Sequence, residues 1–245
     1  MCNSQIHIKR LVLMFLWMLC ICDISYSQDS TRRFSDEELL GKINPSSHSD
    51  FSKVNTSMSS RAGIYLRTEV LAAFEKLESA ASDEGITITI VSGMRSFNQQ
   101  KGIWERKWDR PRYMGWNGFE KALDILTYSS MPGSSRHHWG TDMDVNSLEN
   151  SYFESGEGLK VYEFMKRCGE EFGFFQVYTS KDSGRTGYEE EKWHWSYIPI
   201  SIPMLNAYNG FISTEDIQGF QGASQADSVN IIRDYVNGIS ILDLE

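Results

Sequence analysis

Three of the five histidines in this 245-residue chain lie in two short clusters that also contain acidic, hydroxyl and tryptophan side chains. The first cluster covers residues 135–144 and reads Ser-Arg-His-His-Trp-Gly-Thr-Asp-Met-Asp. The second covers residues 191–197 and reads Glu-Lys-Trp-His-Trp-Ser-Tyr. If both clusters serve one site, the fold must bring together two segments that are far apart in the sequence.

The second cluster predicts a strand over 193–198, whose side chains alternate between two faces. The aromatic residues share the face that would pack into the core: Trp193, Trp195 and Tyr197. His194 and Ser196 share the other face, which would border a cleft. Glu191 precedes His194 by an odd offset, so a straight strand would point the two apart. We therefore expect Glu191 on a bend just before the strand if both serve one site.

The first cluster predicts a strand over 141–145 with two carboxylates on one face. Asp142 and Asp144 share this polar face, and the apolar residues that follow each of them share the other. His137 precedes Gly140, and a glycine allows the chain to turn back over the polar face. The two clusters can therefore present histidine and carboxylate side chains to one cleft.

Two imidazoles and one carboxylate that converge on a cleft are the protein ligands of a catalytic zinc site, which keeps a fourth position for water. Zinc lowers the pKa of such a water to about 7. A carboxylate that is not a ligand can then act as general base, and Glu191 is the candidate. A histidine beside an aromatic run is more often a core or surface residue without a ligand. The residues alone leave both interpretations open.

The spacing Ser-x-His-x-x-Gly-x-x-x-Asp from Ser135, followed by the Glu-x-Trp-His that begins at Glu191, is similar to the zinc D-alanyl-D-alanine carboxypeptidases of the VanY type, which are relatives of the VanX dipeptidases. Residues 92–97, Ser-Gly-Met-Arg-Ser-Phe, resemble the Ser-Gly-Tyr-Arg-Ser segment of the same family, and Gln100 follows them. All three elements occur in the family's order. The resemblance covers roughly residues 60 to 200.

The resemblance implies that three residues bind zinc: His137, Asp144 and His194. It implies that Glu191 is the catalytic base and that Arg95 is associated with the substrate. It also places Gln100 and Ser135 along the substrate pocket. The implied fold is the small α+β core that this family shares with hedgehog-type and lysostaphin-type domains.

The chain departs from the family pattern at three positions. Asp142 stands where the family often has alanine. It could bind a ligating histidine without contacting the ion, or it could compete as a ligand. We expect the first, because a zinc site needs only three protein ligands. Met94 replaces a common tyrosine in the pocket wall. His138 has no counterpart with a known role, and we expect a loop histidine beside Trp139.

Two basic features suit an anionic substrate. Arg95 follows a predicted strand, and its planar guanidinium could bind a peptide's terminal carboxylate. A salt bridge to one of the acidic residues explains Arg95 equally well. Residues 101–112 contain five basic and two acidic side chains, which suits peptidoglycan. A solvated helix face is the alternative interpretation of that segment.

Hydrophobic periodicity predicts helices over 62–82, 97–108, 119–127 and 158–172, and strands over 86–91, 141–145, 174–178 and 193–198. A capping box that begins at Ser35 predicts a short helix. Residues 213–245 predict one or two helices around 229–236, or a hairpin at 237–238. Without a regular βαβ period, the fold class is α+β, a small, mainly antiparallel sheet with helices on one side.

The N-terminal residues have the pattern of a signal peptide. Lys9 and Arg10 precede an apolar run over 11–22 that is too short to cross a bilayer, and small residues follow it. We expect cleavage after Ser27, and rank a permanent anchor or a lipoprotein cut at Cys20 or Cys22 lower. The expected parts are a signal peptide (1–27), a wrapping segment (28–60), a zinc peptidase core (61–200) and a C-terminal helical extension (201–245). Only Cys168 then remains, so no intrachain disulfide can form.

Charge and motifs together define the expected function. The chain has 24 basic and 33 acidic residues, a net charge of -9, which argues against nucleic acid as a partner. We expect an exported, periplasmic or cell-envelope zinc carboxypeptidase with no membrane span in the mature chain. The resemblance implies removal of the C-terminal D-alanine from peptidoglycan stem peptides. The alternatives are an L,D-carboxypeptidase, a D,D-dipeptidase, or a cell-wall-binding module without catalysis.

Overall fold

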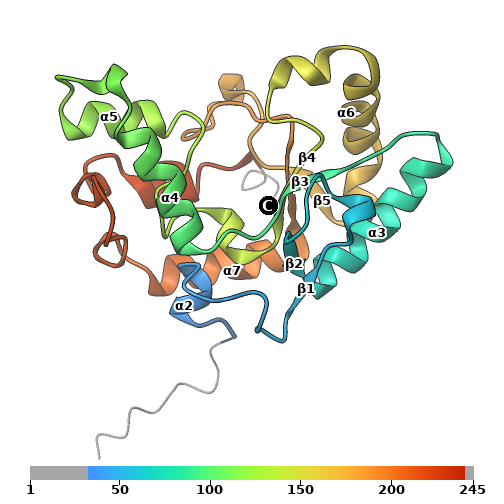
Figure 1. Ribbon diagram of the computed structural model, residues 1–245, viewed down its shortest axis with the longest axis horizontal. Helices are drawn as coiled ribbons and strands as arrows, with labels where there is room; N and C mark the ends of the chain where they lie inside the picture. The colour runs from blue at the N-terminus through green and yellow to red at the C-terminus, as the bar shows by residue number, and fades with distance from the viewer. Residues whose placement is uncertain (1–32, 241–245) are drawn as a thin grey trace, which may run out of the picture. The chain divides into compact units, whose positions relative to one another are not determined.

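The computed structural model describes residues 33–240, coloured along the chain in Figure 1. The expected signal peptide at 1–27 lies outside the described residues. The described residues from Phe34 onward form one compact unit, and this unit contains both histidine clusters. None of the described helices combines the length and the apolar character that a membrane crossing needs.

A four-stranded antiparallel sheet carries both clusters. Its strand order is β3-β4-β6-β5. The strands are β3 (Ile90–Ser92), β4 (Asp142–Val145), β6 (His194–Tyr197) and β5 (Phe174–Gln176). β4 and β6 are neighbours, and their register sets Asp144 opposite His194. The two distant clusters therefore meet in the middle of one sheet, as their alternating patterns predict.

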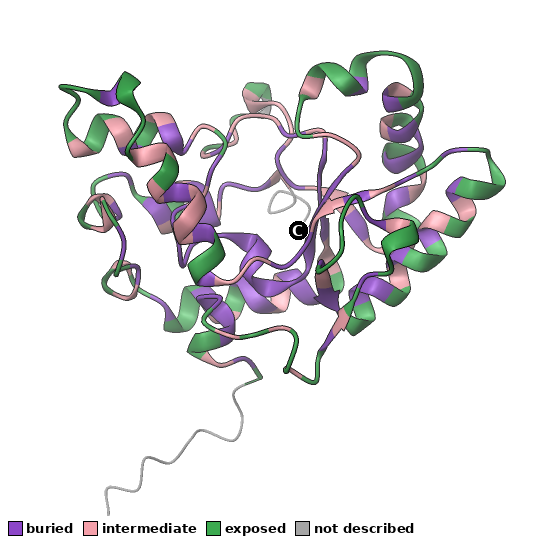
Figure 2. Ribbon diagram, viewed as in Figure 1, coloured by how far each residue is buried: buried purple, intermediate pink, exposed green. Residues whose placement is uncertain are grey.

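The two faces of this sheet differ in chemistry. Met143 and Trp195 point into the apolar core, while the side chains of the polar face surround the candidate site. Two helices, α3 (Thr68–Asp83) and α6 (Gly156–Cys168), lie together on one side of the sheet. The ring of Tyr162 on α6 packs 6.4 Å from that of Trp195. The central strands β4 and β6 are buried apart from Tyr197, whereas the edge strands β3 and β5 are only partly buried (Figure 2).

A further helix reaches the polar face. α7 (Ile198–Phe211) lies on the opposite side of the sheet from α6 (Figure 1), and Ser201 Oγ lies 2.9 Å from Ser196 Oγ on β6. The α+β class is confirmed, with α3 and α6 as the helices expected on one side and α7 as an addition. The helical extension expected from 201 covers most of α7, but hydrophobic periodicity did not mark its bounds, because its residues are apolar nearly all round and show no helical stripe.

Most of the other helices begin at recognisable caps. α2 (Asp36–Leu39), α4 (Phe97–Trp108) and α5 (Gly118–Ile125) each begin with a capping box. The predicted bounds of α4 are confirmed, because Ser96 and Gln99 bond to each other's backbone amides as such a box requires. The helix predicted from 62 begins only at Thr68, since residues before it form a strand.

The N-terminal and C-terminal segments both pack on the core. β1 (Phe51–Lys53) pairs with β2 (Tyr65–Arg67) in a small antiparallel sheet that the periodicity did not predict. After α7 come two 3-10 turns, Thr214–Asp216 and Ala223–Gln225, and a π-helical segment, Ile231–Val236. The helical interpretation of 229–236 is therefore closer to the structure than a hairpin at 237–238.

Candidate metal centre

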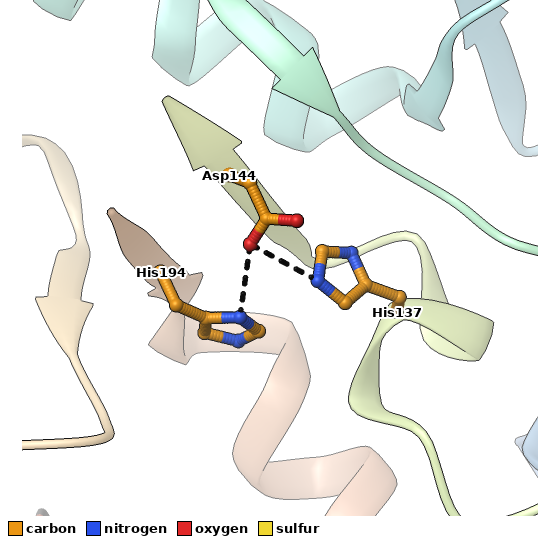
Figure 3. A group of neighbouring side chains, drawn as sticks. All are labelled: His137, Asp144 and His194. Carbon is orange, nitrogen blue, oxygen red and sulfur yellow. Dashed lines mark ion pairs between the residues drawn. The ribbon is translucent and has the colours of Figure 1, made fainter. Parts of the chain in front are cut away.

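Three side chains from three elements point toward one another, as Figure 3 shows. His137 comes from a 3-10 turn (Arg136–Trp139), Asp144 from β4 and His194 from β6. Asp144 Oδ1 lies 3.3 Å from His137 Nε2 and 3.2 Å from His194 Nδ1. One potential ligand atom from each residue lies within 4.8 Å of the other two, and all three residues are buried.

Backbone geometry brings His137 over the strands. Gly140 ends the 3-10 turn in the left-handed region, with φ of 68°. A Cβ at this position would lie 2.3 Å from Phe51 Cε1, so both the conformation and the space require glycine. Gly140 thus lets the chain turn from His137 into β4, as the sequence pattern predicts.

Hydrogen bonds fix which nitrogen of each imidazole faces the group. His137 Nδ1 lies 2.8 Å from the carbonyl oxygen of Gly93 and donates to it, because a carbonyl only accepts. Its Nε2 therefore faces Asp144. His194 Nε2 donates to Asp142 Oδ2 over 2.9 Å, which leaves Nδ1 to face Asp144. Each ring is thus anchored at one nitrogen and presents the other.

These atoms fit a zinc ion. His137 Nε2 and Asp144 Oδ1 are buried atoms without a hydrogen-bond partner among the described residues. Burial of unpaired polar atoms costs free energy of folding unless another group binds to them. Two imidazole nitrogens and one carboxylate oxygen are the donor set of a catalytic zinc site. Burial opposes the charged form of Asp144, but the two histidines and Arg95 outweigh it and lower the pKa of this carboxyl.

Glu191 lies on the expected bend beside the group. His194 N–H donates to the backbone carbonyl of Glu191 over 3.2 Å, which closes a turn before β6. Glu191 Oε2 lies 3.5 Å from His194 Nδ1, so the side chain turns back toward the site. Burial raises the pKa of Glu191 to about 7, although the neighbouring His194 opposes the shift. A carboxyl with this pKa can accept and return a proton at neutral pH.

Arg95 and Gln100 form a connected pair at the edge of the site. Arg95 Nη2 lies 3.2 Å from Asp144 Oδ2, and its Nη1 donates to Gln100 Oε1 over 3.0 Å. Gln100 is fully buried, and its Nε2 donates to the carbonyl oxygen of Ser130. Gln100 therefore orients Arg95, and Arg95 forms a salt bridge with one of the candidate ligands. Arg95 Nε and Ser135 Oγ are buried without a hydrogen-bond partner among the described residues.

A small pocket opens beside the three candidate ligands. It is lined by Arg95, Tyr128, Ser130, Ser135, Arg136, His137, Tyr178, Tyr188, Glu191 and His194. The sequence analysis did not single out the tyrosines or Arg136. The ring of Tyr178 lies 4.6 Å from that of His194, and burial raises the pKa of its hydroxyl well above 10. No spacing rule marks these tyrosines, since Tyr128 follows α5, Tyr178 and Tyr188 follow β5, and the fold alone brings them to one pocket.

His138 is not the loop histidine that the sequence suggests. It is fully buried, and its Nε2 accepts from the backbone N–H of Gly133 over 2.9 Å. Its Nδ1 must then carry the hydrogen, and it donates to the carbonyl oxygen of Arg95 over 2.6 Å. Burial lowers the pKa of His138 to about 3, so the ring is neutral. His138 joins the segment before the turn to the segment that carries Arg95.

The basic segment at 101–112 is partly used within the fold. Lys107 Nζ lies 2.7 Å from Ser129 Oγ, and Lys101 Nζ lies 2.6 Å from the carbonyl oxygen of Gly219. Arg112 pairs with Asp124. These contacts favour structural roles for three of its five basic residues.

The geometry can be compared with known proteins. A family model described as D-alanyl-D-alanine carboxypeptidase, VanY, matches residues 63–200. The chain is 26% identical over 141 residues to a D-alanyl-D-alanine carboxypeptidase of Enterococcus faecalis (strain ATCC 700802 / V583), covering 58% of this chain and 51% of that protein. It is 31% identical over 137 residues to YodJ of Bacillus subtilis (strain 168), covering 55% and 46%. The match spans about half the length of both relatives.

Solved structures share the fold. One is VanYB in complex with D-alanine-D-alanine, with a TM-score of 0.50, 22% identity, and coverage of 67% of this chain and 86% of that one. Another is a vancomycin resistance D,D-pentapeptidase VanY variant in complex with Zn(II), with a TM-score of 0.51, 21% identity, and coverage of 72% and 93%. The LdcB LD-carboxypeptidase is similar to the same degree, with a TM-score of 0.51, 23% identity, and coverage of 65% and 74%.

The matched region coincides with the site. Residues 63–200 include β3, β4 and β6 and every residue of the candidate metal centre. This region is more than half of the chain. The chain belongs to the VanY family of D-alanyl-D-alanine carboxypeptidases.

Proposed function

We propose that this chain is a zinc-dependent carboxypeptidase that removes the C-terminal D-alanine from peptidoglycan stem peptides. The observation that carries the proposal is the buried group of His137, Asp144 and His194, with Glu191 beside it. Family membership supports the reaction type, and the relative from Enterococcus faecalis carries the name of the same activity. One related structure contains Zn(II) and another contains D-alanine-D-alanine.

The residues divide the work of peptide hydrolysis. The bound ion would supply a Lewis acid that favours ionisation of water and polarises the scissile carbonyl. Glu191 accepts a proton from the attacking water and returns it to the leaving amine, a role that its pKa of about 7 supports. His137, Asp144 and His194 would hold the ion, and the protein contacts at their outer atoms keep these side chains in place.

An enzyme that cuts only the last residue must recognise a free terminal carboxylate. Arg95 Nε and Ser135 Oγ are buried donors without partners, and both residues line the pocket. We assign the carboxylate of the terminal D-alanine to these donors, because a guanidinium and a hydroxyl are suited to carboxylate oxygens. Gln100 acts indirectly, through its bond to Arg95.

The first test separates the base from the ligands. In a Glu191→Gln variant, the three metal ligands are unchanged, so it should bind zinc as the wild type does. Turnover of a pentapeptide stem should fall about 10²- to 10⁴-fold, the contribution of a positioned proton acceptor. Metal analysis and product analysis by mass spectrometry measure the two effects.

A Glu190→Gln variant is the matched control, since it removes the neighbouring carboxylate. Its turnover should stay close to that of the wild type. If Glu191→Gln keeps its turnover, Glu191 is not the base.

Release of the last residue from a tetrapeptide would identify an L,D-carboxypeptidase instead. Release of D-alanine from a free dipeptide would identify a dipeptidase. Binding of muropeptides without cleavage would identify a module without catalysis.

We also propose that the protein is exported and acts in the cell envelope. The signal-like pattern of residues 1–27 and the location of peptidoglycan outside the cytoplasm support this. Fractionation of the producing cells tests the proposal, and recovery of the full-length chain in the cytoplasm alone would contradict it.

A further inference from the structure

A buried arginine lies beside the candidate metal centre and also lines its pocket. Arg136 is only 1% exposed, and it precedes His137 in the same turn. Its Nε donates to Asp142 Oδ2 over 2.9 Å, and its Nη2 donates to Ser196 Oγ over 2.7 Å. The guanidinium also lies 4.8 Å from the ring of Trp139. An arginine without solvent contact requires a local counter-charge, and Asp142 supplies it.

Asp142 accepts four hydrogen bonds. Its Oδ2 accepts from Arg136 Nε and from His194 Nε2, both over 2.9 Å. Its Oδ1 accepts from Thr141 Oγ1 over 2.7 Å and from Ser196 Oγ over 2.8 Å. A carboxylate with both oxygens occupied in this way has no oxygen left for a metal ion. Asp142 therefore acts on the site through His194.

From these contacts we infer that Arg136 and Asp142 form a buried ion pair that positions His194 for metal binding. Asp142 holds Nε2 of the ring, so that Nδ1 faces Asp144 Oδ1 at 3.2 Å. Arg136 holds Asp142 in place and balances its charge. The inference rests on the proposed function insofar as the site must bind zinc. We treat both as positioning residues, since Asp142 bonds Nε2 of His194 rather than the nitrogen that faces the other ligands, and Arg136 bonds Asp142 and Ser196.

The Arg136–Asp142 ion pair supports metal binding only when both charges are present. Removal of Arg136 leaves an unpaired carboxylate behind His194, and removal of the Asp142 carboxylate leaves an unpaired guanidinium there. Each single change should therefore weaken metal binding. The family that this chain resembles often has alanine at position 142, so a site without the Asp142 carboxylate is also workable. A variant that lacks both charges should accordingly bind metal better than the sum of the two single losses predicts.

The test is the dissociation constant for zinc, measured by competition with a chromophoric chelator. It compares the wild type with Asp142→Asn, Arg136→Leu and the double variant Arg136→Leu/Asp142→Ala. Each single variant should bind zinc about 10- to 100-fold more weakly, as loss of a partner behind a metal ligand does. The double variant should recover part of the loss. Circular dichroism shows which variants fold.

Glu38→Gln is the matched control. Glu38 is another buried carboxylate, and its Oε1 lies 2.8 Å from Nη2 of the buried Arg67, which bonds to the Trp139 carbonyl oxygen and to no candidate ligand side chain. Its zinc affinity should equal that of the wild type. If Arg136→Leu does not fold, Asp142→Asn decides, because it keeps the shape of the side chain.

The outcomes separate this inference from the proposed function. Folded single variants with wild-type zinc affinity would overturn the positioning role of the ion pair. The same holds if Glu38→Gln weakens zinc binding as much as Asp142→Asn, since the effect would then be general. If the wild type itself binds no zinc, the proposed function fails instead.

Discussion

Each ligand of the candidate metal centre is anchored by a different part of the protein. His137 is anchored by the Gly93 carbonyl, His194 by Asp142, and Asp144 by Arg95 at its outer oxygen. The anchors leave one nitrogen or oxygen of each side chain directed at a common point. Such anchoring reduces the conformational freedom that a metal ion would otherwise have to remove.

The affinity for zinc should depend on pH through His194. Burial alone would lower its pKa, but the hydrogen bond to Asp142 and the nearby carboxylate of Asp144 raise it to about 9. In the metal-free protein at neutral pH, Nδ1 therefore carries a proton that zinc must displace. The affinity should rise about tenfold per pH unit from neutral pH until it levels off near the pKa. Titrations with a competing chelator at several pH values measure this, and an affinity independent of pH in this range would contradict it.

The candidate ligands, the candidate base and the supporting Asp142 can be singled out from sequence, but other residues that support the site cannot. His137, Asp144, His194 and Glu191 lie in short motifs with fixed spacing. The partners of His138, in contrast, are a backbone amide and a backbone carbonyl, which leave no signature in side-chain identity. The role of a residue that bonds to backbone depends on tertiary structure alone.

The arrangement of elements depends on close approach at a few glycines. Gly93 follows β3 and lies against β2. A Cβ there would lie 2.6 Å from the carbonyl oxygen of Tyr65 and 2.9 Å from Ile64 Cγ2. Since Gly93 also accepts the hydrogen bond from His137, the packing of two strands and the orientation of a ligand depend on the same residue.

Gly93→Ala should therefore affect both stability and metal binding. Because backbone atoms must move, we expect the free energy of unfolding to fall by about 1–3 kcal/mol and zinc binding to weaken. Chemical denaturation of the metal-free protein measures the first effect. Gly210→Ala is the control: its Cβ would meet nothing within 4 Å on helix α7, so stability should be unchanged or slightly higher. Equal stability of Gly93→Ala and the wild type would refute this account of the contact.

Element boundaries were predictable where a local signal exists. The capping box at Ser96 begins α4, and Gly173 adopts a positive φ at the end of the turn after α6. β2 was absorbed into the predicted helix from 62, because a three-residue strand is too short to show alternation. Its pairing with β1 is a tertiary interaction. The start of α7 was missed because this helix is apolar nearly all round and contains Pro203, which hides its periodicity.

Across the whole compact unit, segments outside the family match support the site. Tyr208 on α7 donates its hydroxyl hydrogen to the carbonyl oxygen of Gly133 over 2.8 Å, and Gly133 in turn bonds to His138. Phe220 packs against Trp104 on α4, with ring centroids 5.9 Å apart. The C-terminal segment thus packs against the core, and its contacts could not be predicted because their partners are distant in sequence.

Because the ligands come from separate elements, zinc should stabilise the fold as a whole. An ion present at about a hundred times its dissociation constant stabilises the native state by about 2.7 kcal/mol. For a domain of this size, that corresponds to a Tm increase of roughly 5–10 °C. Thermal unfolding with zinc and with a chelator measures the difference. Identical melting curves for zinc-loaded and chelated protein would show that the three side chains do not hold an ion.

The most direct test of the central claim is digestion of a defined pentapeptide stem by the zinc-loaded protein, followed by mass spectrometry. The account predicts a tetrapeptide and free D-alanine, and no product after the metal is stripped. Both His137→Ala and His194→Ala should behave as the stripped protein does. An intact pentapeptide after incubation with folded, zinc-loaded wild-type protein would contradict the account.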